Sequence, residues 1–141
     1  MSKAIRRAAR SRGITRLCHF TGVESLTGIC QDGAILSTQA LMGRDPTSVR
    51  NDHSRYDGHL DYVSCSVQFP NLHVLDSYKQ NDSSGQDWVV LLLNPRLLSL
   101  PTTKFSAVNA ATASGSHVSE GLAGFEAMYQ SQPPSLHNIY R

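Results

Sequence analysis

The chain has 141 residues, a hydrophobic content of 40% and a formal net charge of +2, which fit one folded domain over residues 1–141 and argue against an intrinsically disordered chain. No apolar run approaches the roughly 18 residues of a membrane-spanning helix, and no apolar segment follows the basic N-terminus as it would in a signal peptide. Cys18, Cys30 and Cys65 stand singly inside apolar patterns without a C-x-x-C pair, which predicts buried, reduced thiols in a cytoplasmic protein.

Residues 2–11 predict a helix in the part of the chain that concentrates the positive charge. The basic residues that precede the first acidic residue, Glu24, are Lys3, Arg6, Arg7, Arg10, Arg12 and Arg16. Their spacing of three and four residues places several of them on shared stripes of a helix. Two interpretations stay open: an arm that binds phosphates, or an ordinary solvated helix.

The pattern next predicts a strand over 15–20 and a helix over 22–32. The apolar face of that helix consists of Val23, Leu26, Ile29 and Cys30. Gly33 stands where a C-cap glycine belongs, so the helix is expected to end there.

Thr21 and Glu24 have the T-x-x-E spacing of a capping box, which predicts that Thr21 caps the helix. His19 would then lie beside the free N–H groups of a helix start, where a ligand with ribose hydroxyls or phosphates can bind. A lone histidine among apolar neighbours is more often a structural side chain, so that alternative stays open.

The centre of the chain combines a long polar segment with an alternating one. Residues 42–60 predict a loop, and a loop of this length in a small domain is usually functional or mobile. Arg55 lies in it and is either solvated or able to clamp an anion. Residues 62–69 predict a strand whose polar face carries Ser64 and Ser66, which are ligand donors if that face lines a cleft and solvated otherwise.

The C-terminal half predicts one strand and one helix. Residues 88–93 form a continuous apolar run, typical of a strand buried on both faces, and residues 101–118 look irregular. The helix is expected over 119–130, although two glycines weaken the pattern. Its apolar face consists of Leu122, Phe125, Met128 and Tyr129.

Several catalytic motifs are absent from the sequence. It contains no P-loop, no G-x-G-x-x-G after a strand and no G-x-S-x-G elbow, which argues against kinase, dehydrogenase and hydrolase chemistry. Its histidines form no i, i+4 pair and have no cysteine partner at zinc spacing, so no metal site is expected.

Four segments of the chain together resemble the DarT family of bacterial DNA ADP-ribosyltransferases, most closely the branch that modifies guanine. They occur in the family's order and cover most of the chain. The segments are 12–21 (RGITRLCHFT), 57–71 (DGHLDYVSCSVQFPN), 87–95 (DWVVLLLNP) and 104–111 (KFSAVNAA).

The resemblance implies an α+β ADP-ribosyltransferase fold, a split mixed sheet with flanking helices whose cleft holds NAD as the substrate. It also implies a toxin of a toxin–antitoxin pair that acts on single-stranded DNA. The antitoxin would be a hydrolase of the NADAR type or a macrodomain that removes the modification. No membrane partner is expected.

The resemblance also assigns site residues, position by position. The family's catalytic arginine falls on Arg55, and less well on Arg50. The cofactor-binding positions fall on His19, Phe20, Thr21, Gly28, Leu36 and Arg55, together with the serine strand of Ser64 and Ser66.

The sequence departs from the family at the catalytic glutamate, which lies in a Q-A-E-V-L-type strand near the family's C-terminus. Glu24, Glu120 and Glu126 do not have that context. The expectation is a chain that stops before that strand, as a fragment, or an inactive homologue. Substitution by Glu120 or Glu126 is the weaker alternative.

The resemblance implies the following chemistry for an intact enzyme. Cleavage of the bond between nicotinamide and ribose develops oxocarbenium character beside His19 and Thr21. The loop 42–60 and the basic N-terminus would hold the DNA, and the target guanine would be unstacked.

Three other functions stay open. One is an NAD- or DNA-binding homologue without turnover. Another is an RNA 2′-phosphotransferase, which would need an anion pocket with several arginines. Arg55 is the main candidate for that pocket, and Arg44 or Arg50 is a weaker one. The last is a small structural α/β domain.

Overall fold

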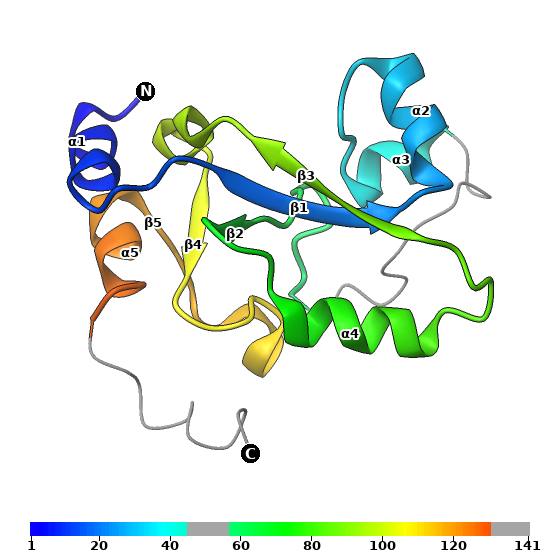
Figure 1. Cartoon of the computed structure of the whole chain (residues 1–141). Helices are drawn as coiled ribbons and strands as arrows, with labels where there is room; N and C mark the ends of the chain where they lie inside the picture. The colour runs from blue at the N-terminus through cyan, green and yellow to red at the C-terminus, as the bar shows by residue number, and fades with distance from the viewer. Residues whose placement is uncertain (45–56, 131–141) are drawn as a thin grey trace. The chain divides into compact units, whose positions relative to one another are not determined.

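The computed structural model of the chain describes residues 1–44 and 57–130 (Figure 1). The chain divides into two compact units, which we call the terminal unit (1–13, 56–58 and 96–141) and the central unit (14–55 and 59–95). The expectation of a single domain over 1–141 stays a prediction.

The central unit is built on a three-stranded antiparallel sheet in the order β2-β1-β3. The strand β1 (Leu17–Gly22) pairs along its whole length with β3 (Trp88–Leu93) and more briefly with β2 (Ser66–Val67). The register sets Leu17 opposite Leu93 and Val67, and Gly22 opposite Trp88. The predicted strands over 15–20 and 88–93 are therefore confirmed, the first with a shift of two residues.

Three helices complete the central unit: α2 (Ser25–Asp32), α3 (Thr38–Arg44) and α4 (Leu72–Asn81). Figure 1 shows α4 on one side of β1, and α2 with α3 on another. Tyr78 of α4 packs edge-on against Phe20 at 5.8 Å and stacks on Trp88 at 6.0 Å between ring centroids. The face of the sheet that carries Phe20 is therefore the one that α4 covers.

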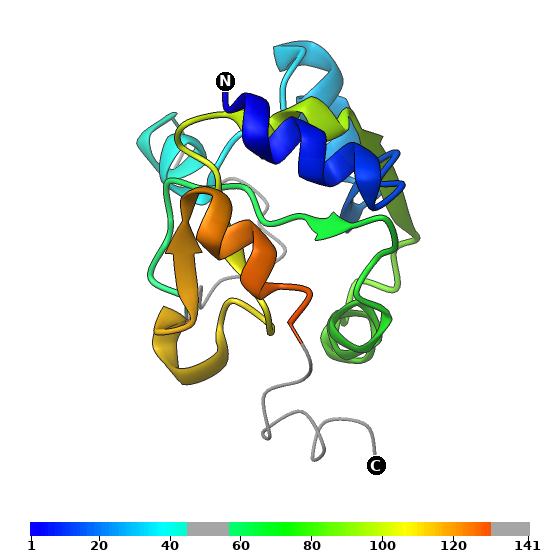
Figure 2. The same cartoon turned by 90° about the vertical axis from the view of Figure 1, so that its left-hand side faces the viewer.

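The terminal unit is built on a two-stranded antiparallel sheet of β4 (Lys104–Ser106) and β5 (Val118–Glu120). The helices α1 (Lys3–Ser11) and α5 (Gly121–Ala127) lie side by side in this unit (Figure 2). Two short 3₁₀ helices, η1 (Pro95–Ser99) and η2 (Thr112–Gly115), connect the elements. The region 101–118 thus contains regular structure where the sequence predicted none.

The core of the terminal unit explains where α1 and α5 form. Ile5 and Ala9, four residues apart on α1, are buried, and Phe125 of α5 is 0% exposed. The Phe125 ring packs edge-on against Phe105 of β4 at 5.5 Å. Ser2 caps α1 by accepting a hydrogen bond from the backbone N–H of Ile5 at 3.3 Å. Both predicted helices are confirmed, and α5 is shorter than expected.

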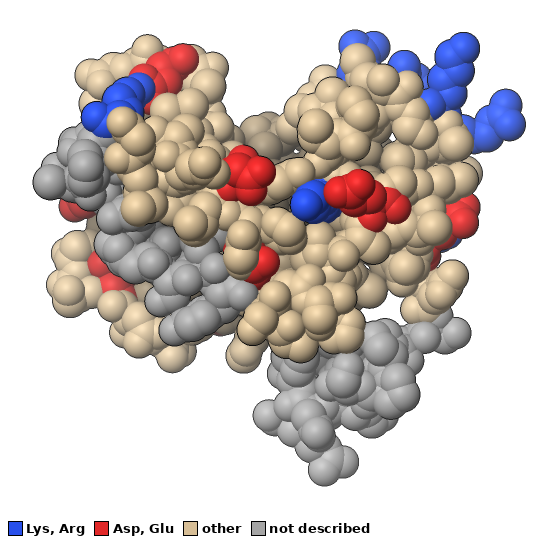
Figure 3. Space-filling view, turned by 180° about the vertical axis from the view of Figure 1, so that it is seen from behind, with Lys and Arg blue, Asp and Glu red and all other residues tan. Residues whose placement is uncertain are grey.

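The outer surface of α1 is strongly basic. The helix has no acidic residue in its first turn and has Arg10 in its last turn, so its charges interact favourably with the helix dipole only at the C-terminal end. Figure 3 shows its Lys and Arg side chains gathered together and projecting from the surface. These side chains belong to Lys3, Arg6, Arg7 and Arg10.

Three local predictions for the central unit are wrong. The strand expected over 62–69 shrinks to Ser66–Val67, because Gln68 adopts a left-handed φ of 70° and turns the chain. The strand β3 is not buried on both faces, since it lies at the sheet edge and Leu92 is 64% exposed. Cys30 and Cys65 are exposed, and Cys18 alone is buried; all are free thiols.

Two further differences concern helices. The helix α4 occupies a stretch for which no element was predicted, and Asn71 caps it by accepting from the N–H of Val74 at 3.3 Å. The start of the predicted loop 42–60 is the end of α3, and residues 45–56 lie outside the described residues.

The fold class is α+β, with small antiparallel sheets and flanking helices, as predicted. Every strand pair among the described residues is antiparallel, so the mixed sheet implied by the resemblance stays a prediction. No helix in the described parts of the chain is long and apolar enough to span a membrane.

Candidate functional site

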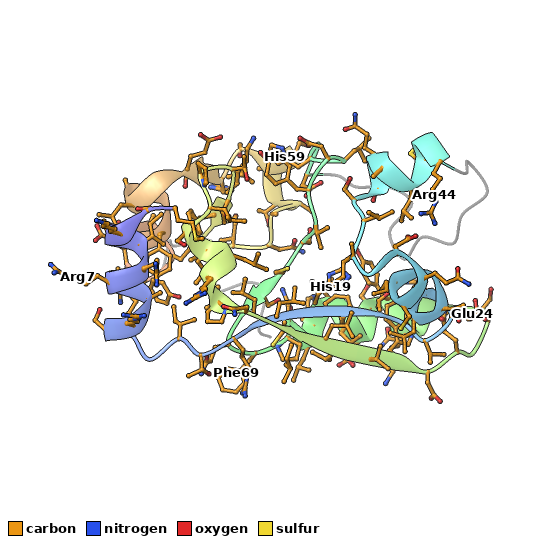
Figure 4. All side chains as sticks on the ribbon, turned by 90° about the horizontal axis from the view of Figure 1, so that it is seen from above. Arg7, His19, Glu24, Arg44, His59 and Phe69 are labelled. Atoms are coloured by element: carbon orange, nitrogen blue, oxygen red, sulfur yellow. The ribbon has the colours of Figure 1, made fainter. Side chains whose placement is uncertain are left out.

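His19 lies in the middle of the central strand and makes one well-defined polar contact. Its Nδ1 is 2.9 Å from the backbone carbonyl oxygen of Ser64 (His19 is labelled in Figure 4). Because a carbonyl oxygen can only accept, Nδ1 carries the hydrogen. Burial lowers the pKa of His19, and the bond to Ser64 opposes this shift more weakly. The ring is therefore neutral at pH 7, and its Nε2 is a hydrogen-bond acceptor.

Thr21 shares a face of β1 with His19, because side chains two residues apart on a strand point the same way. It is only 2% exposed. Phe20 points to the opposite face, where it packs on Tyr78 and Trp88. The three residues of the predicted H-x-T motif are thus divided between two environments.

The predicted capping box at Thr21 is wrong. Thr21 lies inside β1, and Glu24 occupies the N-cap position of α2 without a side-chain capping bond. The physical reason is the pairing with β3: Gly22 pairs with Trp88, and the N–H of Val23 donates to the carbonyl of Asp87 at 2.8 Å. Continued strand pairing therefore replaces the local cap.

The side chain of Gln86 accepts a hydrogen bond at the start of α2 instead. Its Oε1 accepts from the backbone N–H of Glu24 at 3.3 Å, and its Nε2 donates to Asp82 at 3.0 Å. A Cβ on Gly22 would overlap the Gln86 amide, so a larger residue there would displace that side chain. Sequence reasoning missed this contact. A glycine inside a strand was the available signal, since it often marks the close approach of another group.

Gly28 and Leu36 lie on the segments that follow β1. Gly28 is in α2, and a Cβ built on it would meet nothing within 4 Å. The expected αL cap at Gly33 is confirmed by its φ of 62°. Leu36 is half-buried in the connection between α2 and α3. The open space beside Gly28 leaves room for a ligand atom against the helix backbone.

The two serines predicted to share one polar face have different surroundings. Ser64 is exposed and presents its carbonyl to His19. Ser66 pairs with Cys18, and its Oγ accepts from the N–H of Asn71 at 3.2 Å. Ser66 therefore supports the turn into α4, whereas Ser64 lies against the histidine.

The charged candidates are spread over the chain. Arg55 and Arg50 lie outside the described residues. Arg44 forms an ion pair with Asp32 at 2.6 Å. Glu120 lies on β5, where Lys104 is 3.7 Å away, while Glu24 and Glu126 are exposed.

No group of three or more potential metal ligands occurs in the part of the chain that the structure describes. The candidate site thus consists of His19 and Thr21 on one face of β1 and the Ser64 carbonyl, with Gly28 on the helix that follows the strand. This set offers a neutral acceptor and uncharged polar groups, which suit the hydroxyls of a sugar.

Two comparisons with known proteins bear on this site. No curated protein matches the chain. A family model described as "ssDNA thymidine ADP-ribosyltransferase, DarT" matches residues 18–131, which is most of the chain and includes every residue of the candidate site. The family's enzymes take ADP-ribose from NAD and act as toxins on single-stranded DNA. On this match over most of its length, the chain belongs to the DarT family of NAD-dependent ADP-ribosyltransferases.

Proposed function

We propose that this chain binds NAD on the face of β1 that carries His19 and Thr21, and transfers its ADP-ribose to a base of single-stranded DNA. The contact between His19 and Ser64 is the observation that carries this proposal. It fixes the orientation of the imidazole and leaves Nε2 as an acceptor for a ribose hydroxyl.

The reaction at this site is a substitution at the ribose carbon that bears nicotinamide. The bond to nicotinamide breaks, and nicotinamide leaves with the electron pair. The base forms the new bond to the same carbon and loses a proton. Positive charge develops on the ribose between these events, as in glycoside cleavage. Neutral His19 adds no opposing positive charge beside it.

Gly28 and Arg55 have the remaining roles in the proposal. The open space at Gly28 admits part of NAD against α2. Arg55 orients the NAD phosphates or helps to deprotonate the base, as the family resemblance implies. The segment 42–60 and the basic residues of α1 contribute contacts to DNA phosphates.

We propose guanine as the target base, on the resemblance of the sequence segments to the guanine-modifying branch. The family description names thymidine and does not support guanine. The experiment therefore offers the purified chain NAD and two single-stranded oligonucleotides, one with thymidine but no guanine and one with guanine but no thymidine. Mass spectrometry then detects the added ADP-ribose.

The result expected is NAD-dependent addition to the guanine oligonucleotide. Addition to the thymidine oligonucleotide alone would overturn guanine and keep the transferase function. If neither oligonucleotide is modified and NAD is not consumed, the proposed transfer is wrong for this chain.

Two pairs of variants test the site itself. Arg55→Ala should abolish transfer, and Arg50→Ala in the same segment is its control; the reverse pattern would move the role to Arg50. Gly28→Leu should weaken NAD binding at least tenfold by filling the space beside α2. Gly43→Leu is the matched control, since a Cβ at that helical glycine also meets nothing within 4 Å.

A second candidate function is binding of NAD or DNA without turnover. The observation that favours it is the state of the glutamates: none matches the family's catalytic context, and Glu120 has Lys104 beside it. Calorimetry with NAD and a gel shift with an oligonucleotide would then show binding while mass spectrometry shows no product. If transfer occurs, Glu24→Gln, Glu120→Gln and Glu126→Gln show which carboxylate it needs.

The proposal also includes an antitoxin that removes ADP-ribose from the modified base. The resemblance implies a hydrolase of the NADAR type or a macrodomain. Treatment of the modified oligonucleotide with each hydrolase distinguishes them. An oligonucleotide that stays modified with both would exclude these two antitoxin classes.

A further inference from the structure

The central unit exposes three large apolar side chains more than any others of its described residues. Phe69 is 67% exposed, Leu92 64% and Leu72 62%. Exposed apolar side chains that form a contiguous surface patch mark an interaction site for another molecule. None of these residues belongs to the proposed NAD site.

The sheet register places Leu92 and Arg16 near each other. Cys18 pairs with Leu92 on one side and with Ser66 on the other, so these side chains share a face of the sheet. Arg16 precedes Cys18 by two residues and points to the same side. Leu72 begins α4 directly after Asn71, whose N–H donates to Ser66.

Phe69 joins this surface through an unusual backbone turn. Gln68 adopts a φ of 70°, a left-handed conformation that is unfavourable for a residue with a Cβ. Hydrogen bonds hold it there: its Oε1 accepts from the N–H of Thr15 at 3.0 Å, and its N–H donates to the carbonyl of Arg16 at 3.1 Å. The turn holds the Phe69 side chain in solvent, so burial of that side chain does not offset the backbone strain at Gln68.

Arg16 lies over the ring that this turn exposes. Its guanidinium carbon is 5.5 Å from the centroid of Phe69, and its Nε donates to the carbonyl of Gln68 at 2.9 Å. No described carboxylate forms an ion pair with Arg16. An aromatic face and a cation are thus held together in advance, so neither has to be ordered when a partner binds.

We propose that Arg16 and Phe69, bordered by Leu72 and Leu92, form a platform for single-stranded DNA, on which an unpaired base stacks while Arg16 contacts a phosphate. This proposal rests on the proposed function, because it takes single-stranded DNA as the substrate. Aromatic rings beside cationic side chains are the usual means of binding single strands without reading their sequence. The charge of Arg16 is complementary to the phosphate backbone.

The platform is near enough to the proposed NAD site for one single-stranded DNA molecule to contact both. Arg16 directly precedes β1 and lies three residues before His19, or about 10 Å along the chain at the usual rise of a strand. Phe69 and His19 lie on different sides of the β1 ribbon (Figure 4). Because β2 is an edge strand of only two residues, DNA can pass around that edge from one face to the other.

The test measures binding of a fluorescent oligothymidine to the full chain by anisotropy, over a series of salt concentrations. Phe69→Ala should weaken binding about fivefold or more, and Phe69→Trp should restore it. Arg16→Ala should reduce the slope of log affinity against log salt by about 0.7, the value for one phosphate of a single strand. Leu97→Ala, an exposed leucine of η1, is the control that should bind as the unaltered chain does.

Other outcomes would overturn the platform. Unchanged DNA affinity of Phe69→Ala would exclude base stacking there. If the unaltered chain sediments as a dimer and Phe69→Ala as a monomer, the occupant is a second copy of the chain. Failure of the proposed function is distinguishable: the unaltered chain would then bind the oligonucleotide through Phe69 but leave it unmodified.

Discussion

The two units of the chain differ in how they use their apolar side chains. In the terminal unit, Ile5, Ala9, Leu98, Phe105 and Phe125 are all at most 6% exposed. In the central unit, the buried side chains belong to a single strand, β1, at Leu17, Cys18 and Thr21. The same unit exposes Phe69, Leu72 and Leu92 by more than 60% each.

The difference indicates that the buried cluster of the terminal unit mainly stabilises the fold, whereas the exposed side chains of the central unit are available for binding. A buried cluster stabilises a fold in proportion to the apolar surface it removes from water. The terminal unit has such a cluster, and none of the residues proposed to bind NAD belongs to it. The central unit instead places polar groups on one face of β1 and apolar groups near the other. Substitutions of the buried side chains of the terminal unit and of the exposed apolar side chains of the central unit should therefore affect different measurements.

The largest expected effect is on stability, from Phe125→Ala in the terminal unit. Phe125 is 0% exposed and packs on Phe105, so its loss leaves a cavity and should lower the free energy of unfolding by about 3–5 kcal/mol. Leu92→Ala in the central unit should cost much less, because Leu92 is already 64% exposed. Urea unfolding of both variants makes the comparison. Equal losses would show that Leu92 is covered in solution.

The next effect compares two helical glycines, one in each unit. A Cβ on Gly124 would lie 2.7 Å from Ser119 Oγ and 3.0 Å from its carbonyl carbon, so Gly124→Ala should destabilise the chain by about 1–3 kcal/mol. A Cβ on Gly28 would meet nothing within 4 Å, so Gly28→Ala should stabilise α2 by up to about 1 kcal/mol. Thermal unfolding of the two variants measures whether each substitution raises or lowers stability. Destabilisation by Gly28→Ala would mean that the space beside α2 is filled.

A smaller effect concerns NAD affinity alone. His19→Phe removes the acceptor Nε2 and should weaken NAD binding about tenfold, which is the range for one lost hydrogen bond. His19→Gln, which retains an acceptor, should lose less. Calorimetry with NAD measures both, and oligonucleotide affinity serves as the control. If His19→Phe binds NAD normally, the histidine is structural, as its apolar neighbours on β1 also allow.

Local patterns were sufficient where an element is stabilised by its own residues. The helix α1 follows from Ile5 and Ala9 on one stripe, and the end of α2 follows from Gly33. Both could be predicted because the capping and packing residues lie within a few positions of one another.

Long-range contacts decided the features that the sequence did not reveal. Thr21 has a good capping pattern, but β1 continues past it because β3, from a distant part of the chain, pairs with it. The real partner of the α2 start is Gln86, 62 residues from Glu24. The apolar alternation of 62–69 likewise ended early, because Gln68 bonds to Thr15 and Arg16 in a left-handed turn. The same limit applies to the site: the motif predicted His19 and Ser64 separately, and only the fold shows that they are in contact.

The smallest expected effect is a pH dependence, which also distinguishes the two faces of β1. Burial lowers the pKa of His19 in the folded chain below its ordinary value of 6.5. The unfolded chain therefore binds a proton at higher pH than the folded chain does, so the free energy of unfolding should fall as the pH drops below about 6.5. The decrease ends once the pH is below the folded pKa, where both states are protonated.

His19→Gln should remove this part of the pH dependence, and urea unfolding between pH 7 and pH 5 measures it. The control variant is His73→Gln, at an exposed position of α4. Protonation also converts Nε2 of His19 from an acceptor to a donor, so NAD affinity should fall over the same range. DNA affinity at Phe69 should not follow it, because a phenylalanine ring has no titratable group. Parallel losses of NAD and DNA affinity with a single midpoint would show that the two faces of β1 act as one site.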